Sequence, residues 1–351
     1  MVSIMYTFKF ALAVLSLLSL CSANNVINPL GHQADPQPIS RIESDGKRWY
    51  YFPSANRTEA KVYMFASTNL SQVYLGTEPD TQNGRYWEHL PNTGHVIFNF
   101  TKNVHQLPEA PAAFKWNESH YVMYVSSDGP TGNRLYALHN DGKDLKKDWT
   151  FSGVVQYTDG SPLVGYDAFA FNHPNGNKYL MYTNVTTIYI NKFAPEYGFA
   201  TIEHVKDGGN GTVVASRYED PFTEAPDVLI QGKKLNLLYT QNDFFSPNYT
   251  TFNHAVSTEL DPLDPETWKT GQPVQVLASS NTTGVYGTGS VGTFIGPDNK
   301  PWIAYTCFYS DEPFNRADEN LYDPRQIQAQ PLVFKDDEIQ PMIPVKPTRH
   351  F

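Results

Sequence analysis

The sequence has few cysteines and only one long apolar run. Two of its 351 residues are cysteine, Cys21 and Cys307. If an N-terminal signal is removed, Cys307 alone remains, so the mature chain forms no internal disulfide. Cys307 lies in the apolar run WIAYTCF, which indicates a buried thiol and not a nucleophile. We therefore expect a fold that a hydrophobic core stabilises without disulfides.

The motifs of several enzyme classes are also missing. The ten histidines are scattered, without an HExxH motif or a Cys/His cluster, which excludes the common zinc sites. There is no phosphate-binding loop and no GxSxG nucleophile elbow. The formal net charge is −10 and no segment concentrates Lys or Arg, so nucleic acid is not an expected partner.

Residues 1–23 have the pattern of a cleaved secretory signal. Lys9 precedes the apolar run 10–20, and the small residues 21–23 follow at the positions that a signal peptidase reads. The run is too short to span a membrane comfortably, and no other long apolar run follows it, so we expect no membrane anchor. We expect a secreted, extracellular monomer in which residues 24–351 form one domain.

Asn-x-Ser/Thr sequons are more frequent than composition explains, since chance would give about four. The excess favours a eukaryotic glycoprotein. The eight sequons begin at Asn56, Asn69, Asn99, Asn117, Asn184, Asn210, Asn248 and Asn281.

The rest of the chain repeats one design. Each copy has an apolar run, a short polar turn and a second apolar run, which predicts a β-hairpin. The copies begin at Ala34, Glu109, Tyr166, Glu224 and Gly287. Aromatic residues make up 14% of the sequence, which is typical of an all-β protein. Five such units in a chain of this length predict an all-β fold, a five-bladed β-propeller.

An acid stands at the head of the first strand in four of the five copies. These acids are Asp35, Glu109, Asp167 and Glu224, and Ser290 occupies the corresponding place in the fifth copy. In the last four copies, a residue of the second strand follows twelve positions after the residue at the strand head, which is Glu109, Asp167, Glu224 or Ser290. Inner strands of a propeller converge, so the acids should meet. Crowded carboxylates raise one another's pKa, and one can stay protonated beside an ionised neighbour, as hydrolysis of a glycosidic bond requires. A lone acid of this kind would be read as a turn residue, but four favour a functional cluster.

Five short motifs occur in an informative order. They are NPLGHQADP (28–36), YDAFAF (166–171), TEAPDVLI (223–230), VYGTGS (285–290) and RQIQAQPLVF (325–334). Together they resemble glycoside hydrolase family 43, five-bladed propellers that include arabinofuranosidases, arabinanases and xylosidases. The resemblance runs from about residue 28 to the C-terminus. With DPLDPETW (261–268), the order is most similar to exo-acting arabinofuranosidase-like members.

The resemblance implies roles for individual residues. Asp35 matches the general base, Glu224 the general acid, and Asp167 a third acid that orients Glu224 and tunes its pKa. Such enzymes invert the anomeric centre, with the base and the acid about 6.5–9.5 Å apart. Arg325 matches an arginine near the sugar. The implied function is an inverting hydrolase of plant-type polysaccharides, first of all an exo-acting α-L-arabinofuranosidase; a β-xylosidase or a galactanase remains an alternative.

Two motifs depart from the family pattern. GTGS replaces the usual GPGH, so Ser290 stands where a histidine often helps to hold a calcium ion or a water cluster. We therefore expect no metal or other cofactor, although calcium is the one that the resemblance raises. PEAPA (108–112) replaces WAPE, so Glu109 stands where an aromatic residue is usual, and we expect Glu109 and Ser290 to contact substrate. These changes keep open a second function, a secreted carbohydrate-binding propeller without turnover.

Overall fold

The computed structural model describes residues 26–56, 59–74, 93–100, 107–128, 132–204, 210–216, 222–311 and 325–349. The expected signal, 1–23, lies outside these residues. The described chain is built from β-strands and three short 3-10 helices, η1 (Leu70–Gln72), η2 (Pro195–Tyr197) and η3 (Thr267–Lys269). None of the described helices has the length and apolar character needed to cross a membrane.

In the described residues, three sheets have four antiparallel strands each, and an eight-stranded sheet consists of two further antiparallel groups of four that one parallel pair joins, Thr250 with Thr288. We number these five groups as blades in chain order. Blade 1 consists of β2 (Ile39–Ile42), β3 (Arg48–Asn56), β4 (Lys61–Ser67) and β5 (Gly94–Asn99). Blade 2 consists of β6 (Leu107–Lys115), β7 (Tyr121–Asp128), β8 (Arg134–Asn140) and β9 (Thr150–Val154). Blade 3 consists of β11 (Tyr166–Asn172), β12 (Lys178–Asn184), β13 (Thr187–Lys192) and β15 (Thr212–Ser216).

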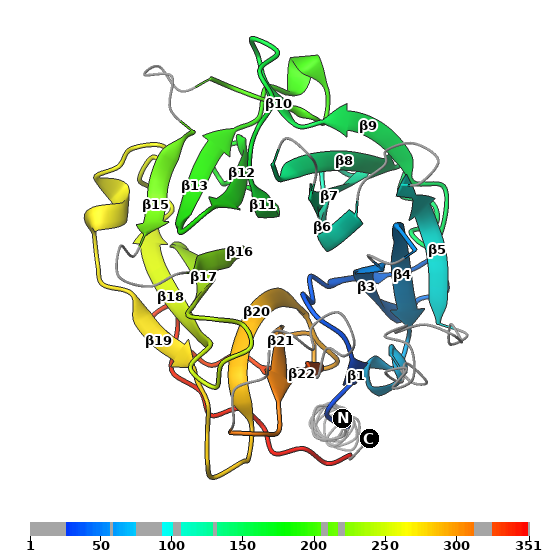
Figure 1. Ribbon diagram of the computed structural model, residues 1–351, viewed down its shortest axis with the longest axis vertical. Coiled ribbons are helices and arrows are strands. Elements are labelled where there is room, and N and C mark those ends of the chain that lie inside the picture. The colour runs from blue at the N-terminus through cyan, green and yellow to red at the C-terminus, as the bar shows by residue number, and fades with distance from the viewer. Residues whose placement is uncertain are drawn as a thin grey trace, which may run out of the picture.

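Blade 4 consists of β16 (Thr223–Gln231), β17 (Lys234–Gln241), β18 (Thr250–Ser257) and β19 (Val274–Leu277). Blade 5 consists of β20 (Tyr286–Ile295), β21 (Pro301–Phe308), β22 (Gln326–Pro331) and the N-terminal β1 (Gly31–His32). Two small pairs lie outside the blades, β10 (Gln156–Tyr157) with β14 (Thr201–Ile202), and β23 (Phe334–Lys335) with β24 (Glu338–Ile339). Figure 1 shows the blades as a ring, with β6, β11, β16 and β20 nearest its middle.

The two ends of the described chain close the ring. β1 pairs with β22, so residues near the N-terminus complete blade 5. The side chain of Asn28 donates to the carbonyl of Ala329 at 2.9 Å and accepts from its N–H at 2.9 Å. The carbonyl of Asn28 accepts from the N–H groups of Thr348 and Arg349. Cys307 in β21 is a free buried thiol, as predicted, and burial raises its pKa to about 12.

The core of the described protein consists of five hydrophobic clusters, one at each junction between blades. Successive residues of a strand point to opposite faces, so each middle strand serves two clusters. In β7, Met123 packs toward blade 1 and Val122 toward blade 3. In β17, Leu237 packs toward blade 3 and Leu238 toward blade 5. This packing fixes the orientation of each blade relative to the next.

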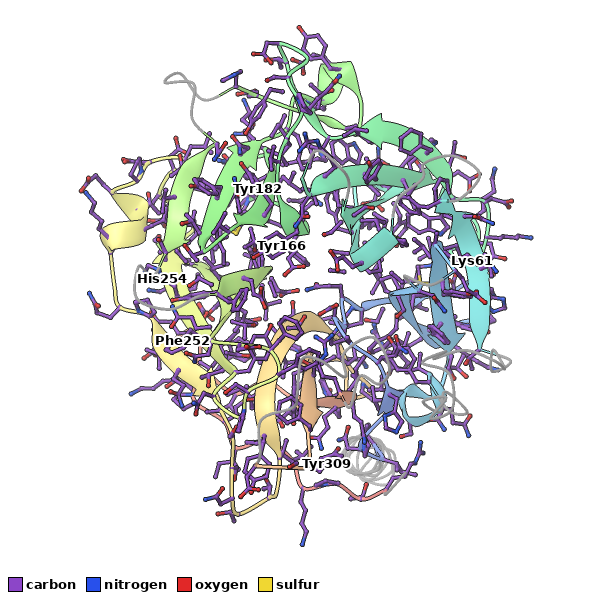
Figure 2. The ribbon with its side chains drawn as sticks, in the orientation of Figure 1. Lys61, Tyr166, Tyr182, Phe252, His254 and Tyr309 are labelled. Atoms are coloured by element: carbon purple, nitrogen blue, oxygen red, sulfur yellow. The ribbon has the colours of Figure 1, made fainter. Side chains whose placement is uncertain are left out.

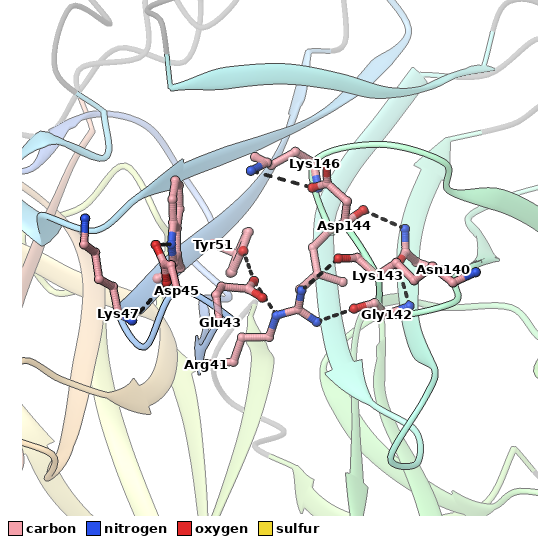
Figure 3. Close-up of polar contacts among 12 residues, drawn as sticks. Arg41, Glu43, Asp45, Lys47, Tyr51, Asn140, Gly142, Lys143, Asp144 and Lys146 are labelled. Carbon is pink, nitrogen blue, oxygen red and sulfur yellow. Dashed lines mark hydrogen bonds and ion pairs between the residues drawn. The ribbon is translucent and has the colours of Figure 1, made fainter.

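Polar contacts also join blade 1 to blade 2 (Figure 3). Arg41 donates from Nη1 to the carbonyl of Gly142 at 2.6 Å and from Nε to Oε1 of Glu43 at 2.5 Å. The hydroxyl of Tyr51 donates to the same carboxylate oxygen. The guanidinium carbon of Arg41 lies 5.7 Å from the ring centre of Tyr51 and 5.4 Å from that of Tyr121. Arg41 therefore bridges β2 and the turn between β8 and β9.

Candidate active site

The first strand of blades 2 to 5 is interrupted by a bulge near its start. The register with the second strand shifts between Glu109 and Ala112, Tyr166 and Phe169, Glu224 and Asp227, and Gly289 and Gly292. Within these bulges a non-glycine residue has positive φ: Ala110 (43°), Asp167 (48°), Ala225 (54°) and Ser290 (42°). Asp35, ahead of β2, has a φ of 52°. Bulges bend a strand and re-aim its side chains, so the repeated motif encodes the geometry of the site.

The constant spacing of twelve residues does not mark equivalent positions. Glu109 and Glu224 begin their bulges, whereas Tyr166 occupies that place in blade 3. Asp167 and Ser290 lie one residue later, at the place with positive φ. The expectation of equivalent positions is therefore wrong by one residue, because a count of residues to the second strand does not show which residue of the bulge carries the functional side chain.

Hydroxyl groups of the preceding blade hold two of the bulges. The N–H of Asp167 donates to Oγ of Ser126 in β7 at 2.8 Å. The N–H of Ser290 donates to Oγ1 of Thr240 in β17 at 3.0 Å. Each hydroxyl belongs to the residue paired with the bulged glutamate of its own blade. The second strand of one blade thus fixes the first strand of the next.

Asp35 is held by residues of blade 5. Its Oδ1 accepts from the hydroxyl of Ser290 at 2.7 Å and lies 3.7 Å from Nη1 of Arg325. The amide of Gln37 donates to the carbonyl of Val291 at 2.7 Å, which fastens the Asp35 segment to β20. The side chain of Asp35 keeps 29% of its surface exposed, against 12% for Arg325. Asp35 is therefore a solvent-reachable carboxylate with two partners that stabilise negative charge.

Glu224 has a different environment. It is buried, and its Oε1 accepts from the hydroxyl of the buried Tyr249 at 3.1 Å. Loss of hydration raises the pKa of Glu224 to about 7, and the negative charges of Asp35 and Asp243 act in the same direction. The hydrogen bond from Tyr249 and the charge of Arg325 oppose this rise in pKa. A carboxylic acid with such a pKa is about half protonated at pH 7 and more so below it, so it can act as a general acid.

Asp167 interacts electrostatically with Glu224, Asp35 and Arg325. Burial raises its pKa well above the usual range, and the charges of Glu224, Asp35 and Glu109 raise it further. The charge of Arg325 lowers it. The four acids that the sequence places at strand heads therefore form one electrostatic cluster, which we call the carboxylate cluster.

Tyr166 is a neighbour of this cluster that sequence reasoning did not select. Figure 2 places it near the middle of the ring. Burial raises its pKa, as do the charges of Glu224, Asp167 and Glu109. Its hydroxyl donates to the carbonyl of Val185, in the turn between β12 and β13, at 2.9 Å. This bond ties the turn to the edge of the carboxylate cluster.

Tyr249 was also missed, although the sequence holds an indirect signal. A Cβ on Gly289 would lie 2.2 Å from Cε1 of Tyr249 and 2.4 Å from Cγ2 of Thr240. Gly289 in the GTGS motif therefore makes room for the ring that reaches Glu224. A glycine at a strand interior often marks such a close approach, but it does not name the approaching residue.

From the sequence we expect no bound metal ion, because Ser290 replaces a histidine of the family pattern. In the described part of the chain, no group of three His, Cys, Asp or Glu side chains is placed to hold a metal ion. The hydroxyl of Ser290 donates a hydrogen bond to Oδ1 of Asp35. Ser290, at the histidine position of the family pattern, thus contacts the carboxylate cluster directly through this hydrogen bond.

The predicted glycosylation sites differ in access. The asparagines of five sequons are exposed: Asn69, Asn117, Asn210, Asn248 and Asn281. Asn99 and Asn184 are partly buried. Asn56 is 7% exposed and its Oδ1 accepts from the N–H of Glu59 at 2.9 Å, so this asparagine is the least accessible of the eight.

The ring of blades and the carboxylate cluster define a class. A propeller that brings a buried acid with a pKa of about 7 together with an accessible carboxylate has the groups that cleave a glycosidic bond. The molecule is a glycoside hydrolase. It belongs to the glycosyl hydrolases family 43, whose family model matches residues 26–339. This confirms the family and the propeller fold that the sequence predicts.

Solved structures agree with this assignment. The crystal structure of α-L-arabinofuranosidase from Lactobacillus brevis has a TM-score of 0.72 at 19% identity, and the match covers 94% of this chain and 100% of that chain. Endo-arabinase from Bacteroides thetaiotaomicron VPI-5482 has a TM-score of 0.59 at 14% identity, covering 89% and 99%. Xylan β-1,4-xylosidase from Bacillus halodurans C-125 has a TM-score of 0.59 at 12% identity, covering 92% and 58%. Such identities show the fold and not the substrate. Comparison with curated protein sequences gives no match.

Proposed function

We propose that this protein is an inverting, exo-acting α-L-arabinofuranosidase that acts on plant-type polysaccharides. The observation that carries the proposal is the contrast between two carboxyl groups. Glu224 is buried, with a pKa of about 7, whereas Asp35 is reached by solvent and bound to Ser290 and Arg325. One group is suited to give a proton and the other to take one.

The proposed reaction is a single displacement. The carboxylate of Asp35 takes a proton from a water molecule, and the water oxygen forms a bond to the anomeric carbon as the bond to the leaving oxygen breaks. The carboxylic acid of Glu224 gives its proton to that leaving oxygen. The products are an alcohol and a sugar of inverted configuration, and proton exchange with solvent restores both groups.

Asp167 and Glu109 have supporting roles in this scheme. The charge of Glu224 raises the pKa of Asp167, and we assign Asp167 to orienting the general acid and tuning its pKa. Glu109 adds a carboxylate where the family usually has an aromatic residue, so we assign it, with Ser290 and Arg325, to contacts with the sugar. No cofactor is part of the proposed reaction.

Arabinofuranose is the proposed sugar because the order of motifs is most similar to arabinofuranosidase-like members. A β-xylosidase or a galactanase would differ only in the residues around the sugar. The expected signal at 1–23 and the exposed sequons support a secreted glycoprotein. We propose that it acts as an extracellular monomer.

A second function, carbohydrate binding without turnover, rests on the two changed motifs. Glu109 and Ser290 alter the surroundings of the three acids, and either change could favour binding over hydrolysis. This alternative predicts a folded protein that binds a glycan and releases no sugar.

The test is sugar release by the purified protein. The substrates are nitrophenyl α-L-arabinofuranoside, nitrophenyl β-D-xyloside, arabinan, arabinoxylan and galactan, with Glu224→Gln as the blank. Glu118→Gln is the matched control, because that carboxylate is 97% exposed. Release of arabinose by the wild type and Glu118→Gln, but not by Glu224→Gln, supports the proposal. Binding without release by the folded wild type would favour the second function.

A further inference from the structure

The turn after β17 places two aromatic rings against Arg325. The guanidinium carbon lies 4.9 Å from the ring centre of Phe244 and 5.6 Å from that of Phe245. The two ring centres are 4.4 Å apart. The rings belong to blade 4, whereas Arg325 directly precedes β22 of blade 5. The loop between β17 and β18 of blade 4 therefore packs two aromatic rings against Arg325 of blade 5.

Hydrogen bonds hold this turn, residues 243–249, in one shape. The N–H of Phe245 donates to Oδ1 of Asp243 at 3.0 Å, and the N–H of Ser246 donates to the Asp243 carbonyl at 2.9 Å. The N–H of Tyr249 donates to the carbonyl of Ser246 at 3.0 Å. Tyr249 then reaches Glu224 through its hydroxyl. The 243–249 turn thus positions the rings of Phe244 and Phe245 against Arg325 and the hydroxyl of Tyr249 against Glu224.

We propose that Phe244 and Phe245 are positioning residues for hydrolysis, which hold Arg325 beside Asp35 through cation–π contacts. The inference rests on the proposed function and extends it to residues that touch neither reacting group. An arginine has a long, flexible side chain, and a positive charge over an aromatic face is attracted to it. The rings therefore fix the guanidinium 3.7 Å from Oδ1 of Asp35.

The position of Arg325 has a consequence for the general acid. Glu224 interacts with charged or titratable groups from several elements, namely Asp35, Asp167, Asp243, Arg325, Tyr166 and Tyr249. Arg325 lowers the pKa of Glu224. If the rings no longer hold Arg325, its opposing effect weakens and the pKa of Glu224 rises. Because Glu224 acts in its protonated form, the basic limb of kcat/KM then moves to higher pH.

The test compares three substitutions of aromatic residues in blade 4. Phe244→Leu removes the ring, and Phe244→Tyr retains an aromatic face. Phe252→Leu is the matched control, because Phe252 stacks on Tyr239 and lies away from the middle of the ring of blades (Figure 2). Phe245 is left unchanged because it is buried and its loss would disturb folding.

The readout is kcat/KM against pH on the polysaccharide that the wild type cleaves, because a sugar leaving group, unlike nitrophenolate, needs the proton of Glu224. Phe244→Leu is expected to lower kcat/KM roughly tenfold to a hundredfold, as misplacement of a catalytic environment does. It should also move the basic limb to higher pH. Phe244→Tyr should restore both properties, and Phe252→Leu should behave as the wild type. A wild-type profile for Phe244→Leu would overturn the proposal.

A double-mutant cycle in chemical denaturation tests the contact without turnover. Phe244→Leu, Arg325→Gln and the combined variant are compared with the wild type. The two changes together should destabilise the protein by less than the sum of their separate effects, because both remove the same contact. Strictly additive effects would overturn the positioning role. This cycle remains informative if no substrate is cleaved, so failure of the positioning role and failure of the proposed function can be told apart.

Discussion

Replacement of Glu224 by Gln should stabilise the protein at alkaline pH while it abolishes turnover. Glutamine keeps the shape of the side chain and an oxygen that can accept from Tyr249, but it cannot ionise. In the wild type the pKa of Glu224 is about 7 in the folded protein, against a model value of 4.5. The folded state therefore binds this proton more tightly than the unfolded state.

The sign and the size follow from this difference. The stabilising contribution of the protonated carboxyl is fully present below about pH 4.5 and is lost as the pH rises toward 7. One pKa unit corresponds to about 1.4 kcal/mol, so the folded wild type loses about 3 kcal/mol across this window. Gln has no such loss. The charge of Glu224 also raises the pKa of Asp167, so its removal favours the folded variant further at high pH.

Urea denaturation of the wild type and Glu224→Gln measures this effect. The free energy of unfolding of the variant, relative to the wild type, should increase by about 3 kcal/mol between about pH 4.5 and about pH 8. Glu118→Gln, which changes an exposed carboxylate, should show little change across the same range. An equal difference between Glu224→Gln and the wild type at both pH values would refute the assigned environment of Glu224.

Three further substitutions test neighbouring features. Tyr249→Phe removes a hydrogen bond that lowers the pKa of Glu224, so the basic limb of kcat/KM should move up by about one to two units, since a hydrogen bond to a charged group is worth ~1.5–3 kcal/mol; an unmoved limb would contradict that contact. Gly289→Ala places a Cβ 2.2 Å from the Tyr249 ring, and calorimetry should show destabilisation by about 1–3 kcal/mol together with lower kcat; unchanged stability and kcat would contradict the close approach of the ring. Val185→Gly relieves a φ of 58° at an exposed turn and should stabilise the protein by about 1 kcal/mol in denaturant titrations; a loss of stability would mean that the valine has packing contacts of value.

The repeated hairpins were predictable because their signals are local. The run 223–240 places a Gly-Lys turn between two apolar segments, and β16 and β17 form there, with Gln231 paired to Lys234. Five such units predicted the propeller, which the family match confirms. The clustering of the strand-head acids followed from the convergence of inner strands, while their roles in hydrolysis stay predictions.

The register of the bulges could not be predicted in the same way. Ala110 and Ala225 adopt positive φ, although alanine has no intrinsic preference for that conformation. Interactions between blades impose it, as the hydroxyls of Ser126 and Thr240 show for Asp167 and Ser290. Such contacts join residues about 40 to 50 positions apart and exist only after neighbouring blades have packed together.

The residues that contact the acids and Arg325 could not be predicted from the sequence either, because these contacts also join residues far apart in the chain. Tyr249 lies 25 residues after Glu224 and is the middle residue of the sequon that begins at Asn248, where nothing in the sequence signals a donor to a buried acid. Phe244 and Phe245 meet Arg325 across the junction of two blades. The geometry of the closed ring decides which of many aromatic residues reach the carboxylate cluster.

The most direct test of the central claim is proton NMR of arabinan during hydrolysis by the wild type and by Glu224→Gln, because a sugar leaving group needs the proton that Glu224 gives. The account predicts that the wild type releases arabinose whose first-formed anomer is β, and that Glu224→Gln releases none. An α anomer formed first, or release by Glu224→Gln at the wild-type rate, would contradict the assignment of Asp35 and Glu224 as base and acid.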